Sequence, residues 1–402
     1  MNKMTLTLTV TVLCAGLAYS ADWPQFLGPE ANGIAPDTGI NKDWSARPPQ
    51  ELWRVELSDN GYAGPSVAEG KVFIIDRDGD NDVVRAIDFT TGEDVWTFSY
   101  PDPGKDNYGY ARATPVFSEG RLYTLGRMGQ LHCLNAGDGT VVWSRDIRQE
   151  FGGRPPNWLY AMSPKIDGEK LIVCPGGETG VAALNRDTGE TLWTGGLDGL
   201  PGYATPAVAE LQGRKQYVIF AGVDLYGVDA ETGGEALWQI PWENRSKVNA
   251  AVPLVAEDFV FITSDYGLGC ALVYVGPEGA KTFWKNEQLQ AHFNTPVYYK
   301  GYFFGIGNAG RGGDLMCLSP QNGQPAWRQE GFEKGGLVAV DDVLIAIGGA
   351  TGDVVMVDAT AESYRELGRI KPLGGQSWTA PIIADGKLIV RNKSAMVCLD
   401  LM

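Results

Sequence analysis

Short apolar runs separated by polar turns recur along most of this chain of 402 residues. Residues 113–143 illustrate the unit, in which the runs TPVF, RLYTLG, QLHCLNA and TVVW are separated by turns at 118–120, 128–129 and 137–139. Alternation of apolar and polar positions between glycine-containing turns is typical of antiparallel strands. The unit therefore predicts a four-stranded antiparallel sheet. After the N-terminal segment, no ten-residue stretch has convincing helical periodicity.

The unit repeats, and a tryptophan ends its fourth run in most copies. These residues are Trp53, Trp96, Trp143, Trp193, Trp238, Trp284 and Trp327, spaced by 43, 47, 50, 45, 46 and 43 residues. Strand repeats of this period predict a β-propeller, in which each copy is one blade. The copy at 336–367 is the weakest, because it has neither the tryptophan nor the proline that opens the other copies. We expect the tryptophans to lie between neighbouring blades, with their N–H groups bonded.

The two ends of the repeat set the number of blades. The last copy stops at CLDLM after its third run, whereas residues 51–57, ELWRVEL, form a fourth run that belongs to no copy. Joining the two completes an eighth blade and removes exposed sheet edges. We therefore predict an all-β fold, an eight-bladed propeller over residues 51–402 that an N-terminal strand closes.

The first 50 residues do not fit the repeat. Residues 1–20 combine Lys3, an apolar stretch and small residues ending at Ser20, which predicts a cleaved signal peptide. The stretch is too short to span a bilayer comfortably, and Leu13 before Cys14 disfavours a lipid anchor. We expect an exported protein, periplasmic or extracellular, without a transmembrane segment. Residues 21–50 are rich in proline and glycine and predict an irregular extension against the side or rim of the ring.

Composition narrows the classes of partner. The net charge of −16 disfavours nucleic acid and anionic membranes as partners. With only His132 and His292, the chain cannot hold a histidine-rich zinc site. The odd number of cysteines after Ser20, and the strand contexts of three of them, predict free thiols. They are Cys133, Cys174, Cys270, Cys317 and Cys398. We expect a monomer.

The loops that join the blades carry aromatic and polar residues that vary from copy to copy. In a propeller these loops share one face with the turns between second and third strands. The candidate ligand-binding residues on this funnel face are Tyr62, Arg112, Tyr160, Tyr203, Asn249, His292, Phe293, Asn294 and Trp378. Such residues either bind a ligand or only pack at the rim. Arg112, Asn249 and His292 are the better functional candidates because the repeat does not require them.

Two loops have compositions that suggest ions. The stretch DRDGDND places alternating carboxylates at Asp76, Asp78, Asp80 and Asp82. Calcium prefers several carboxylate oxygens together, but Gly79 comes too early for the usual helix-flanked loop, so a plain solvated turn is the competing interpretation. The glycine-rich stretch at 307–314 does not open a helix, which weakens a phosphate-binding interpretation.

The strings before the repeated tryptophans resemble a known family. AIDFTTGEDVW, CLNAGDGTVVW, ALNRDTGETLW and CLSPQNGQPAW are similar to the tryptophan-docking motif of the pyrroloquinoline-quinone (PQQ) repeat propellers. The resemblance covers residues 51–402 and implies the propeller fold. The family includes dehydrogenases with a calcium-bound quinone and non-catalytic scaffolds, such as the propeller lipoprotein of the outer-membrane β-barrel assembly machinery.

The dehydrogenase class departs from this chain in several features. Its members usually have adjacent cysteines under the quinone and long insertions, which this sequence lacks. The sequence therefore favours an exported, non-catalytic scaffold, without a cofactor, that holds a protein, peptide or glycan on its aromatic face. The alternatives are a PQQ- and calcium-dependent dehydrogenase of alcohols or sugars, and a hydrolase or lyase that uses funnel carboxylates.

Overall fold

The computed structural model describes residues 22–104, 108–308 and 312–402. The predicted signal peptide lies outside the described residues, as does the middle of the glycine-rich loop at 307–314. Strands dominate, and the one helix of the described part, α1 (Ile147–Glu150), is a single turn capped by Asp146. The all-β class is therefore confirmed.

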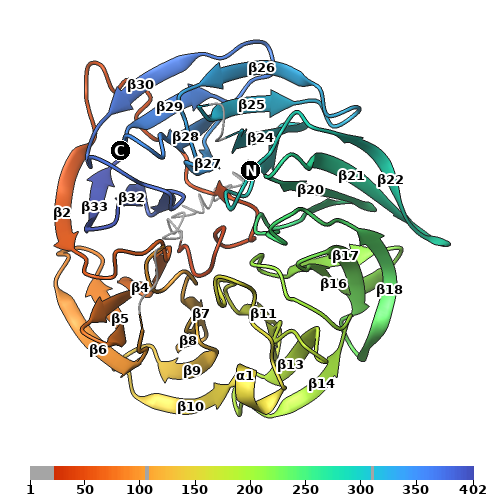
Figure 1. Ribbon diagram of the computed structural model, residues 1–402. Helices are drawn as coiled ribbons and strands as arrows, with labels where there is room; N and C mark the ends of the chain where they lie inside the picture. The colour runs from red at the N-terminus through yellow and green to blue at the C-terminus, as the bar shows by residue number, and fades with distance from the viewer. Residues whose placement is uncertain (1–21, 105–107, 309–311) are drawn as a thin grey trace, which may run out of the picture.

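The strands of the described residues form seven sheets, which Figure 1 shows arranged around a common centre. The first two contain β3 (Ser66–Ala68), β4 (Lys71–Asp78), β5 (Asn81–Asp88), β6 (Asp94–Pro101), and β7 (Val116–Ser118), β8 (Arg121–Leu125), β9 (Gln130–Asn135), β10 (Val141–Asp146). Two further sheets contain β19 (Leu254–Ala256), β20 (Phe259–Ser264), β21 (Gly269–Gly276), β22 (Gly279–Asn286), and β23 (Val297–Tyr299), β24 (Tyr302–Gly307), β25 (Asp314–Leu318), β26 (Pro325–Glu330). Each is the four-stranded antiparallel unit that the repeat predicts.

One larger sheet joins two such units. It contains β11 (Lys165–Asp167), β12 (Lys170–Val173), β13 (Val181–Asn185), β14 (Thr191–Gly195), and β15 (Ala207–Leu211), β16 (Arg214–Phe220), β17 (Asp224–Asp229), β18 (Gly233–Pro241). A single parallel bridge between Gly195 and Gly234 connects them. The two halves are otherwise antiparallel meanders like the other sheets.

The remaining two sheets include strands from the N-terminal region. One contains β1 (Ile34–Ala35), β27 (Leu337–Val340), β28 (Val343–Ile347), β29 (Val354–Asp358) and β30 (Glu366–Ile370), so the weakest copy does form four strands. The other contains β2 (Gln50–Glu56), β33 (Ala395–Asp400), β32 (Lys387–Arg391) and β31 (Ile382–Ala384). In it β2 runs antiparallel to β33 and places Trp53 opposite Cys398.

A β-bulge recurs in the outer strands, at the residue before the repeated tryptophan. The register skips Leu52, Val95, Val142, Leu192, Phe283 and Ala326. All six are exposed apolar side chains, led by Phe283 at 57%. A bulge bends and twists an edge strand, which discourages pairing with another chain. The bulge thus protects an outer wall that would otherwise present flat apolar edges.

The tryptophan after the bulge contacts the next sheet. The indole N–H groups of Trp53, Trp96 and Trp143 donate to the carbonyls of Phe89, Ala136 and Arg186 at 2.9–3.1 Å. Trp284 and Trp327 donate in the same way to Pro320 and Thr360. Trp238 instead bonds Gln216 of its own sheet, and the Trp193 N–H has no partner among the described residues.

Glycines make room for these rings. Gly92, Gly139 and Gly189 have φ of +74° to +76°, and a Cβ there would lie within 3.0 Å of the tryptophan of the preceding sheet. The glycine of each turn therefore serves both the left-handed backbone and the packing of the ring.

All five cysteines of the described residues are buried free thiols, as predicted. Burial raises the pKa of Cys133 to about 11 and that of Cys398 to about 12, which leaves both protonated and unreactive at neutral pH.

The N-terminal extension is irregular apart from β1, but the prediction of its path was only half right. Its first part crosses the centre of the molecule (Figure 1). Trp23 exchanges two backbone hydrogen bonds with Val67 of β3, and the Phe117 N–H of β7 donates to Pro24 at 2.8 Å. Composition could not show this path, because it depends on open backbone edges of strands far along the chain.

The second part of the extension does run along the outside. There Trp44, 3% exposed, packs on Gly368 of β30, where a Cβ would lie 2.7 Å from the Trp44 Cβ. Gly368 follows the bulge of its strand, which is the position of the repeated tryptophan. The extension thus supplies the ring that the weakest copy lacks.

Candidate functional site

The centre of the molecule contains a cavity of about 250 Å³ among the blade-joining loops. Phe26 and Leu27 of the extension line it, and the same two residues line a second cavity of about 420 Å³ bounded by β11, β15 and β19. The extension therefore divides the hollow centre in two. The first cavity is blind at the side where Phe26 and Leu27 lie.

Seven of the nine predicted ligand-binding residues line this first cavity. They are Tyr62, Arg112, Tyr203, His292, Phe293, Asn294 and Trp378. Most of them precede the proline that opens an inner strand, so the entry loops of different sheets bring them to one place. Half-buried aromatic rings around a cavity are typical of a ligand site.

Two predicted residues, Tyr160 and Asn249, are not among the residues that line this cavity. Tyr160 is 2% exposed, and its hydroxyl donates to the Pro175 carbonyl at 2.7 Å. Asn249 is fully buried and donates to the carbonyls of Ala221 and Trp242. Each side chain donates to the backbone of a buried loop. The position of the residue in the sequence does not show that a loop requires such a donor.

Aromatic rings form a continuous series along one side of the cavity. Tyr62 stacks on Trp378 with ring centroids 4.9 Å apart, and Phe293 follows at 5.4 Å from Trp378. His292 lies 4.9 Å from Phe293, and its Nε2 shares a 2.9 Å hydrogen bond with the Tyr266 hydroxyl. The side chains therefore order one another before any ligand is present.

Arg112 organises the opposite side. Its guanidinium donates to the carbonyls of Trp158 and Gly109. The Trp158 N–H donates in turn to the Tyr203 hydroxyl at 3.1 Å. Arg112 thus holds the loop that presents Trp158, and its positive charge remains at the cavity wall.

The lining residues that were missed from sequence include Phe26, Leu27, Trp158, Tyr266 and Lys334. Tyr266 could have been found, because it lies in the turn between β20 and β21, and such turns were assigned to the funnel face. Trp158 lies in a long loop without repeat register. Phe26, Leu27 and Lys334 carry no signal in the local sequence.

The titratable groups of the cavity are mostly neutral at pH 7. Burial, with the Lys334 charge as a second cause, lowers the pKa of His292 to about 4. Burial raises the pKa of Tyr62 and of Tyr203 to about 12. Among the described lining residues, the charged side chains are therefore the cations Arg112 and Lys334.

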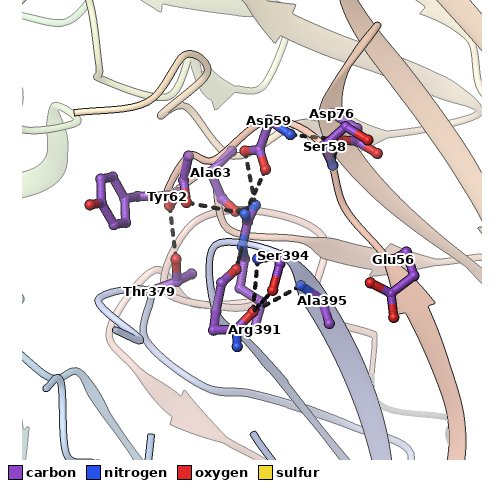
Figure 2. A network of polar contacts seen from close by, with 12 residues as sticks. Glu56, Ser58, Asp59, Tyr62, Ala63, Asp76, Thr379, Arg391, Ser394 and Ala395 are labelled. Carbon is purple, nitrogen blue, oxygen red and sulfur yellow. Dashed lines mark hydrogen bonds and ion pairs between the residues drawn. The ribbon is translucent and has the colours of Figure 1, made fainter. Parts of the chain in front are cut away.

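The loop that carries Tyr62 rests on a buried ion pair, shown in Figure 2. Arg391 of β32, 1% exposed, donates to both carboxylate oxygens of Asp59 at 2.8 and 3.3 Å and to the carbonyls of Gly61 and Ala63. Thr379 Oγ1 donates to the Tyr62 carbonyl at 3.0 Å. The loop is thereby bound to the C-terminal sheet on both sides of Tyr62.

The four aspartates proposed for calcium have other surroundings. The turn is only Gly79-Asp80, since Asp76 and Asp78 end β4 and Asp82 lies in β5. Asp76 accepts the Ser58 and Asp59 N–H groups, as Figure 2 shows, and pairs with Arg85 at 2.8 Å. Asp82 is fully buried beside Arg77. This arrangement favours the plain turn.

Two wider features complete the description. Among the described residues, no group of three or more His, Cys, Asp and Glu side chains could hold a metal ion. The same part of the chain has no helix of a length and hydropathy that could cross a bilayer.

Comparisons with known proteins agree with this architecture. A family model described as outer membrane protein assembly factor BamB matches residues 43–107 and 80–329. The BamB of Yersinia pestis is 24% identical over 374 residues, covering 87% of this chain and 88% of that protein. The BamB of Shewanella oneidensis is 23% identical over 380 residues, with coverage of 87% and 88%.

Solved structures are similar in fold at lower identity. The BamB of Moraxella catarrhalis superposes with a TM-score of 0.61 at 16% identity, covering 88% of this chain and 97% of that one. A quinohemoprotein alcohol dehydrogenase from Comamonas testosteroni gives a TM-score of 0.64 at 14% identity, covering 96% and 81%. These likenesses establish the fold alone, since scaffolds and dehydrogenases share it.

Proposed function

We propose a function from the premise that this chain belongs to the family of the outer membrane protein assembly factor BamB. The chain is a non-catalytic propeller that binds another protein through the aromatic cavity. Its architecture is an eight-bladed ring over residues 51–402, closed by β2. The four-stranded units and the pairing of β2 with β33 support this architecture.

The observation that carries the proposal is the chemistry of the cavity lining. It combines half-buried, mutually stacked rings with cations and with tyrosines held neutral, and none of its described residues is Asp or Glu. Such a surface offers apolar contact and hydrogen bonds but no carboxylate base, and burial lowers the pKa of its histidine, His292, to about 4, which makes that imidazole a weak base at neutral pH. Binding is what this lining can do.

The second candidate is the quinone-dependent dehydrogenase, which the shared fold favours. Calcium takes six to eight oxygen ligands, largely carboxylates. The described residues of the cavity offer no carboxylate, so this donor set does not fit a calcium-bound quinone. The chemistry of the lining therefore favours the binding function over the dehydrogenase.

The partner is a protein or a peptide segment, with a glycan as the alternative ligand for stacked rings. The BamB relatives are named as factors of outer membrane protein assembly. We propose that this chain acts outside the cytoplasm as a monomer, exported by residues 1–20.

Removing two rings from the cavity tests the function. The double variant Trp378→Ala and Phe293→Ala should lose capture of envelope proteins from the source cells, because both rings of the stacked series are gone. The matched control is Phe283→Ala, which removes an exposed ring from the outer wall and should leave capture unchanged. Quantitative mass spectrometry of the captured proteins is the measurement.

Two results would count against the proposal. Capture that survives in the cavity variant would place the binding surface elsewhere. Stoichiometric uptake of PQQ with calcium, together with reduction of a dye by alcohols or sugars, would establish the dehydrogenase instead.

A further inference from the structure

The lining of the aromatic cavity is electrostatically unlike the rest of the chain. The protein has 49 acidic residues and a net charge of −16. Among the described residues that line the cavity, however, the ionisable side chains other than tyrosine are Arg112, His292 and Lys334. An acidic protein that keeps carboxylates away from one cavity has a local field that attracts anions there. This observation deepens the proposed function and rests on it.

Of the two lining cations, Lys334 is the one whose ammonium group has no hydrogen-bond or ion-pair partner among the described residues. Its Nζ lies 4.8 Å from the centroid of the Trp378 ring, and no carboxylate of the described residues lies within 4.0 Å of it. Arg112, by contrast, donates to two carbonyls. A half-buried ammonium group without a counter-ion gains more from an incoming anion than an exposed one does.

The backbones of Lys334 and Trp378 are joined by a third side chain. Asn294 is 6% exposed, and its Nδ2 donates to the Lys334 carbonyl at 3.1 Å and to the Trp378 carbonyl at 3.4 Å. One amide therefore connects the backbone of Lys334 with that of Trp378. Such preorganisation reduces the entropy lost on binding.

The size of the cavity limits the ligand. A volume of about 250 Å³, blind at Phe26 and Leu27, accepts one ring-bearing group and no folded segment. The stacked pair of Tyr62 and Trp378 offers an aromatic face to that group.

We propose that this cavity binds an aromatic group that carries a carboxylate. The ring lies among Tyr62, Phe293 and Trp378, and the carboxylate pairs with Lys334. The same chemistry occurs in a peptide that ends in an aromatic residue and in a free aromatic acid, and the experiment distinguishes the two.

Binding of paired acids and amides tests the proposal by calorimetry on the full mature chain. The probes are 3-phenylpropionate, its amide, and an acetylated hexapeptide ending in Phe with a free or an amidated carboxyl group. A charge-assisted hydrogen bond should make each acid bind about tenfold more tightly than its amide. If the hexapeptide acid binds more tightly than 3-phenylpropionate, the natural ligand is a peptide that ends in an aromatic residue. If 3-phenylpropionate binds more tightly, the natural ligand is a free aromatic acid.

Three variants assign the effect to Lys334. Lys334→Gln should abolish the preference for the acid, and Lys334→Arg should keep it. The matched control is Lys393→Gln, which removes a cation 5.5 Å from the Tyr62 ring that does not line the cavity, and which should also keep the preference.

Two outcomes overturn the proposal. In the first, the wild type shows no preference for the acid, because it binds acid and amide equally or binds neither. In the second, the preference for the acid survives in Lys334→Gln. Neither touches the proposed function, which fails if protein capture survives the loss of Trp378 and Phe293, or if the protein takes up PQQ with calcium and reduces a dye. A wild type that captures protein but ignores the carboxylate would therefore remove this inference and leave the function standing.

Discussion

The outer wall and the central cavity are both rich in aromatic rings, yet they use them differently. On the wall, the tryptophans occupy one register position after a bulge, and most of them donate to a carbonyl of the next sheet. In the cavity, the rings come from loops of unequal length and contact one another. A ring that recurs in register holds the fold together, whereas rings that depart from the register are available for a ligand.

The largest expected effect concerns the buried ion pair between Arg391 and Asp59, which supports the cavity loop that carries Tyr62. Arg391→Met leaves the Asp59 carboxylate buried without its partner, so the free energy of unfolding should fall by about 4 kcal/mol. Chemical denaturation measures it. The control is the double variant Arg391→Met with Asp59→Leu, which removes both charges and should recover part of the loss. If the free energy of unfolding falls by less than about 1 kcal/mol in the single variant, the ion pair is not essential to the stability of this loop.

Next in size is the direct comparison of two tryptophans. Trp327 is 8% exposed and packs in the wall, so Trp327→Ala should cost about 3 kcal/mol. Trp378 is only half-buried in the cavity, so Trp378→Ala should lower the free energy of unfolding by about 1 kcal/mol. The same variant should abolish ligand capture. Denaturant midpoints and capture assays on the two variants make the measurement. Equal losses of stability would mean that the cavity rings only pack.

A smaller effect is expected at the glycines that accommodate the wall rings. Gly189→Ala should cost about 2 kcal/mol, because φ is +75° and the new Cβ would lie 2.9 Å from the Trp143 ring. Gly120→Ala is the matched control, with φ of +73° and no neighbour within 4 Å, and should cost about half as much. Thermal unfolding of the pair separates backbone strain from the clash. Equal costs would contradict a packing role for Gly189.

The smallest effect is a change of pKa, and it distinguishes the two histidines. Burial alone lowers the pKa of His132 to about 4, whereas Lys334 contributes to the same shift at His292. Lys334→Gln should therefore raise the pKa of His292 and leave that of His132 unchanged, as NMR titration of the two imidazoles can measure. A pKa of His292 that stays the same or falls in Lys334→Gln would contradict an effect of Lys334 on this imidazole.

These two pKa values also give the sign of the pH dependence. Both folded-state values lie below the ordinary value of 6.5, so protons bind the unfolded chain more readily between pH 6.5 and pH 4. The histidine contribution to stability is therefore present above pH 6.5 and is lost as the pH falls toward 4. Replacing either residue with Gln should reduce that loss.

The sequence by itself determined the β class, the four-stranded unit, the free thiols and most of the cavity rings. Each depends on short-range patterns: alternation of apolar residues, turn glycines, and the place of an aromatic residue before a proline. Tyr62, Phe293 and Trp378 could be found because the repeat register places equivalent loops together.

Only the tertiary structure decided the path of the extension, the place of Lys334 and the burial of Asn249 and Tyr160. Trp44 replaces a missing ring over Gly368, more than 300 residues along the chain, and nothing in the neighbourhood of either residue encodes that contact. Long-range packing of this kind depends on which surfaces the folded sheets leave open. A local pattern specifies the sheets, but their open edges and hollows exist only once the sheets have assembled around the centre.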